Sequence, residues 1–265
     1  MSTVILERPS AARHVPSTPS RSAERARRQW AWLLAGLALA FSVPFVFADL
    51  LTIDRDLYYG IYAAAVFGFC ALWLRYGVES ARGLLTHNLR RGVLLGVVFA
   101  GVTAAIVFTE TATAHPKGLG FAAAIAWRGV VYGATDGVLL SVSPILAVFA
   151  PFSTRPLRER GKPAVAAIGV LALGVSLLFT AVYHLGYPDF RGSKVRKPMI
   201  GDVVWSTPTL VTLSPVGAPI AHIGLHVAAV VHAYDTETFL PPHETASRTM
   251  LGSGTDGSVP PAEIT

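Results

Sequence analysis

Long apolar runs, several of them free of charge over 18 or more residues, limit the fold of this chain more than any other feature. An α-helix rises ~1.5 Å per residue, so a run of this length crosses the ~30 Å hydrocarbon core of a bilayer. The runs lack the polar stripe of period 3.6 that a helix of a water-soluble core carries. They predict an all-α, polytopic transmembrane helix bundle with about six or seven membrane segments.

Composition agrees with a membrane protein and excludes some partners. Only 14% of the residues are charged, whereas about a quarter is usual in soluble domains. The net charge of +6 lies between the apolar runs and forms no continuous basic stripe, so we expect the lipid bilayer as a partner and no nucleic acid. Cys70 is the only cysteine and cannot form an intramolecular disulfide. Arginine outnumbers lysine by 18 to 4, which favours a bacterial source and the cytoplasmic (inner) membrane.

The chain divides into a membrane domain and two polar tails. Residues 1–29 predict a disordered basic tail, residues 30–235 the helical domain, and residues 236–265 a second disordered tail. A signal peptide is the competing interpretation of the first run, because Val46-Phe47-Ala48 resembles a cleavage site. The long leader and the continued apolarity at Leu50 and Leu51 favour an uncleaved anchor.

Basic residues between the runs predict the orientation. If the first five runs each cross once, the basic tail and two basic loops share one side, which is then cytoplasmic and holds the N-terminus. The loop 187–200 is also basic and opposes this assignment. The apolar segments are Trp30–Leu51, Leu57–Trp73, Gly92–Thr109, Leu119–Phe152, Ala164–Tyr183 and Ile200–Tyr234, and the two basic loops hold Arg75, Arg82, Arg90 and Arg91, and Arg155, Arg158, Arg160 and Lys162.

The last segment is interrupted by Pro208, Pro215, Gly217 and Pro219. Proline removes a backbone donor and clashes with the preceding turn, and a broken segment at membrane depth is tolerated where protein or a cavity surrounds it. We expect a short helix over 200–213, a break at 214–219 and a second helix over 220–234. A hairpin and one kinked span both fit this pattern.

Ionisable side chains inside apolar runs are costly and face the protein interior. Arg128 and Asp136 differ by about 80° around one helix and by ~12 Å along it, so each is expected to find a partner on another helix. Snorkelling of Arg128 to the interface is the alternative.

Three histidines are candidate metal ligands. His222 and His226 share one helix face, and such a pair can bind a metal, for instance zinc, when a third ligand arrives. His184 at the end of the fifth run is the candidate third ligand. His232 lies about 120° around the helix from His226 and should not join them.

Three short motifs in residues 119–235 suggest a family. Trp127-Arg128-Gly129 resembles the downstream half of Glu-Glu-x-x-x-Arg, Phe179 to His184 resembles Phe-x-x-x-His with Phe one place early, and Gly217 to His226 matches the layout of a third, histidine-containing motif. In these features the chain resembles the CAAX-protease and bacteriocin-processing family of intramembrane proteases, as a degenerate member or a distant relative. The resemblance implies a helical membrane fold in which His184 and His226 lie near one another, with Arg128 close to both.

Departures from the family pattern argue against its peptidase chemistry. The two glutamates would fall at Ala123 and Ala124, which cannot bind a metal or accept a proton, and the Asn-like position is Val230. The sequence therefore favours a non-catalytic protein, without stoichiometric zinc, that holds or senses another membrane protein or a lipid. An intramembrane metallo-hydrolase or peptidase using His184, His222, His226 and Asp136, with Arg128 in its site, and a small transporter remain as alternatives.

Overall fold

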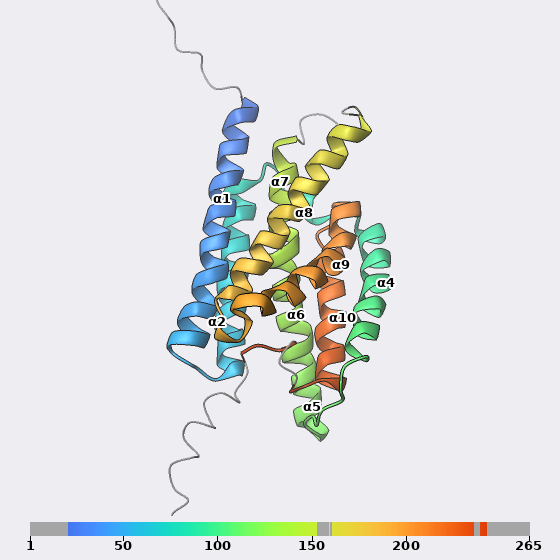
Figure 1. The fold of residues 1–265 in the computed structure, drawn as a ribbon. Helices are drawn as coiled ribbons and strands as arrows, with labels where there is room; N and C mark the ends of the chain where they lie inside the picture. Colours follow the sequence, from blue (N-terminus) through green and yellow to red (C-terminus); the bar gives the residue numbers. More distant parts are fainter. Residues whose placement is uncertain (1–20, 153–158, 160, 236–238, 243–265) are drawn as a thin grey trace, which may run out of the picture.

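The structure, a computed structural model, describes residues 21–152, 159, 161–235 and 239–242. Its described residues form helices and no strand, which confirms the all-α bundle (Figure 1). Within the described residues, five helices are long and apolar enough to cross a membrane, and the expected sixth segment forms two shorter helices. The spans are Ala23–Leu50, Arg55–Gly77, Leu89–Val107, Gly118–Phe152 and Lys162–Leu185.

The first helix begins nine residues earlier than expected. Helix α1 covers Arg21–Val43, so the part of the predicted disordered tail that the structure describes is helical. Buried partners hold this polar turn: the amide of Gln29 donates to the carbonyl of Gly77 at 2.6 Å and accepts from Trp73 Nε1 at 3.0 Å. Arg25 forms an ion pair with Glu79. Residues 1–20 lie outside the described part.

The other long helices follow the apolar runs closely, and three short elements lie in the connections between them. Helices begin and end within a few residues of the runs because the length of each run sets its span. The elements are η1 (Pro44–Leu50), α2 (Arg55–Leu72), η2 (Trp73–Gly77), α3 (Ala81–Leu85), α4 (Leu89–Val107), α8 (Lys162–Leu185), η7 (Pro188–Phe190) and η8 (Gly192–Val195).

One long, irregular helix is the centre of the bundle. The window that defines the span Gly118–Phe152 is 78% buried, against values between 22% and 39% in the other four spans. Two π-helical segments interrupt it on either side of α6, and π-helical turns occur often at functional sites. Its parts are α5 (Gly118–Ala124), η3 (Ile125–Val131), α6 (Tyr132–Asp136), η4 (Gly137–Val142), α7 (Ser143–Phe149) and η5 (Ala150–Phe152).

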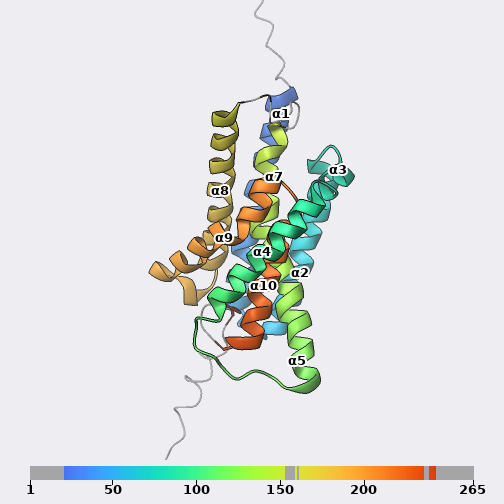
Figure 2. The same cartoon turned by 90° about the vertical axis from the view of Figure 1, so that its right-hand side faces the viewer.

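The interrupted last segment is a helical hairpin. Helix α9 covers Arg196–Thr212 and α10 covers Gly217–His232, which decides between the hairpin and the kinked span (Figure 2). The chain reverses at Leu213, whose φ of 54° is left-handed. Thr209 secures the turn, since its hydroxyl donates to the carbonyl of Ser214 at 2.9 Å and accepts from the amide of Ala218 at 2.8 Å.

A stripe of glycines brings α10 against the central helix. Gly129, Gly133 and Gly137 follow one another at four-residue spacing and face α10 along its length. A Cβ at Gly133 would lie 2.9 Å from the backbone oxygen of His222, and one at Gly137 would lie 2.5 Å from Pro219 Cα. Small residues at such spacing let membrane helices approach closely. The contact therefore carries the histidines of α10 to the middle of the bundle.

The two ends of the bundle differ in what they carry. In Figure 2 the start of α1, the connection through α3 and the start of α8 lie towards the same end, as expected for the basic tail and the two basic loops. Arg155, Arg158 and Arg160 lie outside the described residues. At the other end, Phe239 and Leu240 are buried, and Pro242 accepts a hydrogen bond from Arg55 Nε at 2.8 Å. This part of the predicted disordered tail is therefore packed, and residues 243–265 lie outside the description.

Candidate metal centre

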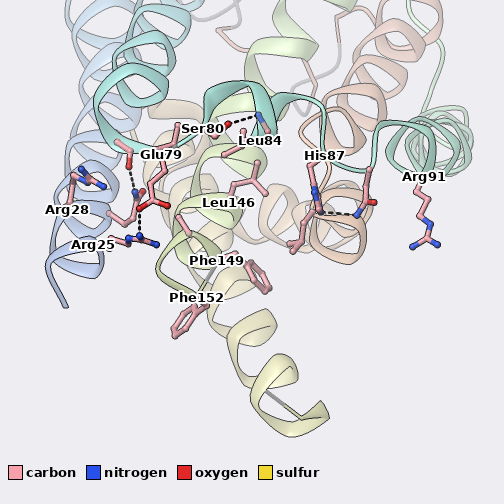
Figure 3. A pocket seen from close by; sticks show the side chains of 17 residues that line it. Arg25, Arg28, Glu79, Ser80, Leu84, His87, Arg91, Leu146, Phe149 and Phe152 are labelled. Atoms are coloured by element: carbon pink, nitrogen blue, oxygen red, sulfur yellow. Dashed lines mark hydrogen bonds and ion pairs between the residues drawn. The ribbon is translucent and has the colours of Figure 1, made fainter. Parts of the chain in front are cut away.

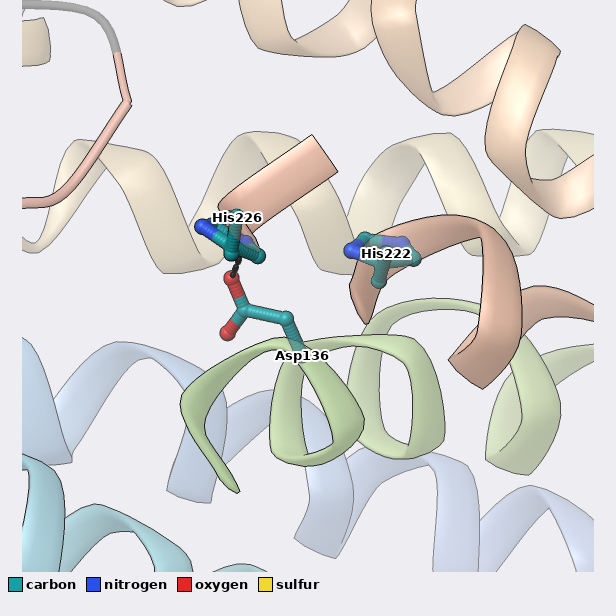
Figure 4. A group of neighbouring side chains, drawn as sticks. All are labelled: Asp136, His222 and His226. Atoms are coloured by element: carbon teal, nitrogen blue, oxygen red, sulfur yellow. Dashed lines mark ion pairs between the residues drawn. The ribbon is translucent and has the colours of Figure 1, made fainter. Parts of the chain in front are cut away.

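Asp136, His222 and His226 meet in the middle of the bundle (Figure 4). Asp136 ends α6, and the two imidazoles project from successive turns of α10 towards it. All three side chains are buried, with exposures of 4%, 1% and 4%. One potential ligand atom from each lies within 4.8 Å of the other two. The sequence predicted the histidine pair with His184 as its third ligand and named Asp136 as a further candidate; among the described residues the structure brings Asp136, and not His184, to the pair.

The spacing of Asp136 and His226 fits two ligands of one ion. Nε2 of His226 lies 3.2 Å from Oδ2 of Asp136, but without the geometry of a hydrogen bond. Two ligand atoms of a tetrahedral zinc ion, each bonded at about 2.0–2.1 Å, lie about 3.3 Å apart. A cation between these two atoms would therefore satisfy both without moving either helix.

Unsatisfied nitrogens support the same interpretation. Nδ1 of His222 and both ring nitrogens of His226 are buried without a hydrogen bond among the described residues. A buried polar atom without a partner is costly, and most such atoms in proteins are satisfied. Bound metal ions use imidazole nitrogens of this kind as ligands.

Hydroxyl groups hold the outer sides of two of these ligands. Tyr62 donates to Oδ1 of Asp136 at 2.9 Å, which leaves Oδ2 towards His226. Oγ of Ser141 lies 3.4 Å from Nε2 of His222. The other ring nitrogen, Nδ1, has no hydrogen-bond partner among the described residues and is the one left to bind a metal. Partners of this kind orient metal ligands and fix their tautomers.

Beyond Ser141 lies a second buried carboxylate, Asp202 of α9. Ser206 donates to its Oδ1 at 2.7 Å and Ser176 to its Oδ2 at 3.0 Å, and Asp202 has no exposed surface. Ser206 also lies 2.7 Å from Ser141 Oγ. A hydroxyl chain thus links Asp202 to the imidazole of His222.

Charge balance favours a divalent cation. Within the described residues, no lysine or arginine forms an ion pair with Asp136 or Asp202. Ionised carboxylates in a membrane interior need a compensating charge. One divalent ion held by neutral imidazoles would balance both.

Six buried tyrosines form the opposite wall of the site. The ring of Tyr132 packs edge-on against His226 at 4.7 Å. Its hydroxyl lies 3.0 Å from that of Tyr183, and Tyr187 donates to Tyr183 at 2.7 Å. Burial raises the pKa of Tyr187 well above its ordinary value, so its hydroxyl stays protonated. The hydroxyl chain therefore runs from beside His226 to the end of α8, and the tyrosines are Tyr58, Tyr59, Tyr62, Tyr132, Tyr183 and Tyr187.

His184 lies beside the cluster but outside the group of three. It is close enough to Asp136 and His226 to interact with both electrostatically, and its ring packs edge-on against that of Tyr183 at 5.1 Å. Its Nδ1 donates to the carbonyl of Thr180 at 2.8 Å, so Nε2 is the nitrogen that carries the lone pair. We therefore assign it a place next to the metal ligands.

Arg128 does not join the cluster. Its Nε and Nη2 each donate to one carboxylate oxygen of Asp56 at 2.8 Å, and Nη1 donates to the hydroxyl of Tyr234. Its side chain is 14% exposed and that of Asp56, in the first turn of α2, is 47% exposed, so Arg128 is partly buried and paired with another helix, as predicted. His232 also lies elsewhere, as expected, and its Nε2 donates to the carbonyl of Glu110 at 2.9 Å.

Sequence reasoning missed the residues that support the ligands. Tyr62, Ser141 and Asp202 lie on three different segments, and no local pattern links them. Asp202 carried a usable signal, because an acidic residue within an apolar segment marks a functional candidate. The glycines at 129, 133 and 137 carried another, since their spacing predicts a close helix contact next to Asp136.

Comparisons with protein-family models, curated proteins and solved structures give no match to this chain.

Proposed function

We propose that this protein is an intramembrane metalloprotein of hydrolytic type, which holds a zinc ion with Asp136, His222 and His226. The observation that carries the proposal is the convergence of these three buried side chains, with unsatisfied nitrogens on both imidazoles. Two imidazoles and one carboxylate are a ligand set of catalytic zinc sites, in which water takes the fourth position. The zinc content of the purified protein tests the proposal.

The residues around the site suit hydrolysis. Zinc held by such ligands supplies a water that ionises near neutral pH. His184 carries its lone pair on Nε2 and lies beside Asp136 and His226, so it suits the role of a hydrogen-bond acceptor for that water. The tyrosine hydroxyls between His226 and Tyr187 suit the transfer of a proton towards the end of the bundle. The substrate class would be a peptide or ester bond that enters the bilayer.

The resemblance to the CAAX-protease family remains a proposal on this basis. Ala123, at one of the positions of the missing glutamates, is exposed on the surface of the bundle, while Asp136 supplies the carboxylate. A related fold would therefore place its acidic ligand at a different point of the same helix. In the non-catalytic alternative favoured by the sequence, the same three side chains would only hold α10 against the central helix. That alternative predicts that the purified protein contains no metal.

A substitution of Asp202 tests whether this residue helps to hold the metal ligand His222 in place. Asp202→Asn keeps the size of the side chain but removes the charge that Ser206 and Ser141 connect to His222. We expect zinc affinity to fall about 10- to 100-fold, as is usual when such a partner is lost. Competition with a fluorescent zinc chelator measures it. Thr207→Val, at an exposed hydroxyl of the same helix, is the matched control, and equal affinity in both variants would contradict the role of Asp202.

For localisation we propose a bacterial inner membrane protein with a cytoplasmic N-terminus. The start of α1 and the α2–α4 connection lie at the same end of the bundle, and the connection and the first turn of α4 carry Arg82, Arg90 and Arg91. Basic residues gather on the cytoplasmic side of membrane proteins, which supports this orientation. An impermeant thiol reagent applied to intact cells should label Thr111→Cys and spare Thr86→Cys, since these exposed residues lie at opposite ends. Permeabilised cells should label both. The reverse pattern in intact cells would invert the orientation.

A further inference from the structure

A groove of about 960 Å³ opens at the end of the bundle that carries the start of α1 (Figure 3). It lies far along the chain's central helix from Asp136, against the last turns of that helix, and shares no residue with the metal centre. Its lining joins α1, the connection between α2 and α4, and the end of the central helix. It is therefore a separate site.

Chemistry divides the groove into an apolar floor and a polar rim. Leu146, Phe149 and Phe152 form the floor, and in Figure 3 they lie between Arg25 and Arg28 on one side and Arg91 on the other. Ser80, His87 and Asn88 add hydrogen-bonding groups to the rim. A ligand that satisfies both surfaces must itself be amphipathic.

The charge of the rim is positive. Glu79 is the acidic residue of the lining and forms an ion pair with Arg25. Arg28 and Arg91 are exposed and make no ion pair within the described residues. Two guanidinium groups are thus available to a negatively charged headgroup.

The groove lies at the boundary of the predicted hydrocarbon layer. Its lining comes from the start of the first and third spans and from the end of the second and fourth. At this level of a membrane, lipid headgroups meet acyl chains. Basic pockets between transmembrane helices bind anionic lipid headgroups there.

We propose that this groove binds an anionic phospholipid, whose negatively charged headgroup is attracted by Arg28 and Arg91 on the two sides of the rim and whose acyl chain lies on the Leu146–Phe149 floor. The combination of unpaired guanidinium groups with an apolar floor at the membrane boundary carries the inference. The site is independent of the metal centre.

Matched double variants test the proposal. Arg28→Gln with Arg91→Gln removes the two rim charges, while Arg27→Gln with Arg90→Gln removes two exposed neighbours outside the lining, with the same change in net charge. The protein in detergent is titrated with phosphatidylglycerol or phosphatidylcholine, and native mass spectrometry measures the bound lipid. Thermal midpoints in detergent confirm that both variants are folded.

We expect the parent to prefer phosphatidylglycerol and the rim variant to bind it roughly 30-fold more weakly, at about fivefold for each basic residue. The control variant should bind like the parent, and millimolar inorganic phosphate should not compete. If both double variants lost the same affinity for phosphatidylglycerol, general surface charge would explain the effect and the groove would not be the lipid-binding site. If phosphate competed, the ligand of the groove would be a small soluble anion and not a phospholipid.

Discussion

Protein purified without chelators is expected to contain about one zinc ion per chain, as in other three-ligand zinc sites. His226→Ala and Asp136→Ala should each lower zinc affinity more than about 100-fold, beyond the loss expected for a supporting partner. The reason is geometric: the 3.2 Å pair of Nε2 and Oδ2 supplies two of three ligands, and neither has a substitute among the three converging groups. Elemental analysis and chelator competition measure both effects.

His232→Ala is the matched control for this experiment. It removes an imidazole from the same helix, but one that is bonded to the carbonyl of Glu110 away from the site. Zinc at about 100 times its dissociation constant should also stabilise the parent by about 2.7 kcal/mol through mass action, and leave the two ligand variants unchanged. A metal-free parent with no zinc-dependent thermal shift would refute the metal centre and favour the structural, non-catalytic protein.

Zinc without hydrolysis would be a different outcome. The Asp202→Asn variant separates the metal centre from its proposed support by Asp202. If the parent and this variant bind zinc equally well, the metal centre stands and only the role of Asp202 is refuted. A parent that binds zinc and cleaves no membrane-buried peptide or ester would retain the site and remove the hydrolase.

The sequence predicted the spans well because the length of an apolar run is itself the physical cause of a span. The first helix was the exception: Gln29 and Arg25 look like a solvated tail until Gly77, Trp73 and Glu79 are brought beside them. Long-range partners of this kind leave no local pattern. The same limit hid the pairing of Arg128 with Asp56, 72 positions away.

Two of the three groups of the metal centre could be placed together in the same way. His222 and His226 share a face because of helical periodicity, and the break at 214–219 was visible as a cluster of proline and glycine. The third ligand depends on the register between α10 and the central helix. That register is fixed by packing at Gly129, Gly133 and Gly137, which no property of α10 alone reveals.

This register leads to the second large effect. Gly137→Ala adds one methyl group at a point where a Cβ would lie 2.5 Å from Cα and 2.8 Å from N of Pro219. Backbone atoms cannot rotate away, so α10 must shift relative to the central helix. Overpacking of this kind costs about 1–3 kcal/mol and sometimes more. Because Asp136 is the adjacent residue, the shift should also separate its carboxylate from His226 and lower zinc affinity.

Gly174→Ala and Gly101→Ala are the controls, since a Cβ at either helical position meets nothing within 4 Å. Alanine is also the better helix former by about 0.5–1 kcal/mol, so these variants should be as stable as the parent or slightly more stable. Thermal unfolding in detergent and chelator competition on the same samples give both readouts. A Gly137→Ala protein with the parent's stability and zinc affinity would show that α10 does not approach the central helix closely, and the arrangement of Asp136 beside His222 and His226 would then be wrong.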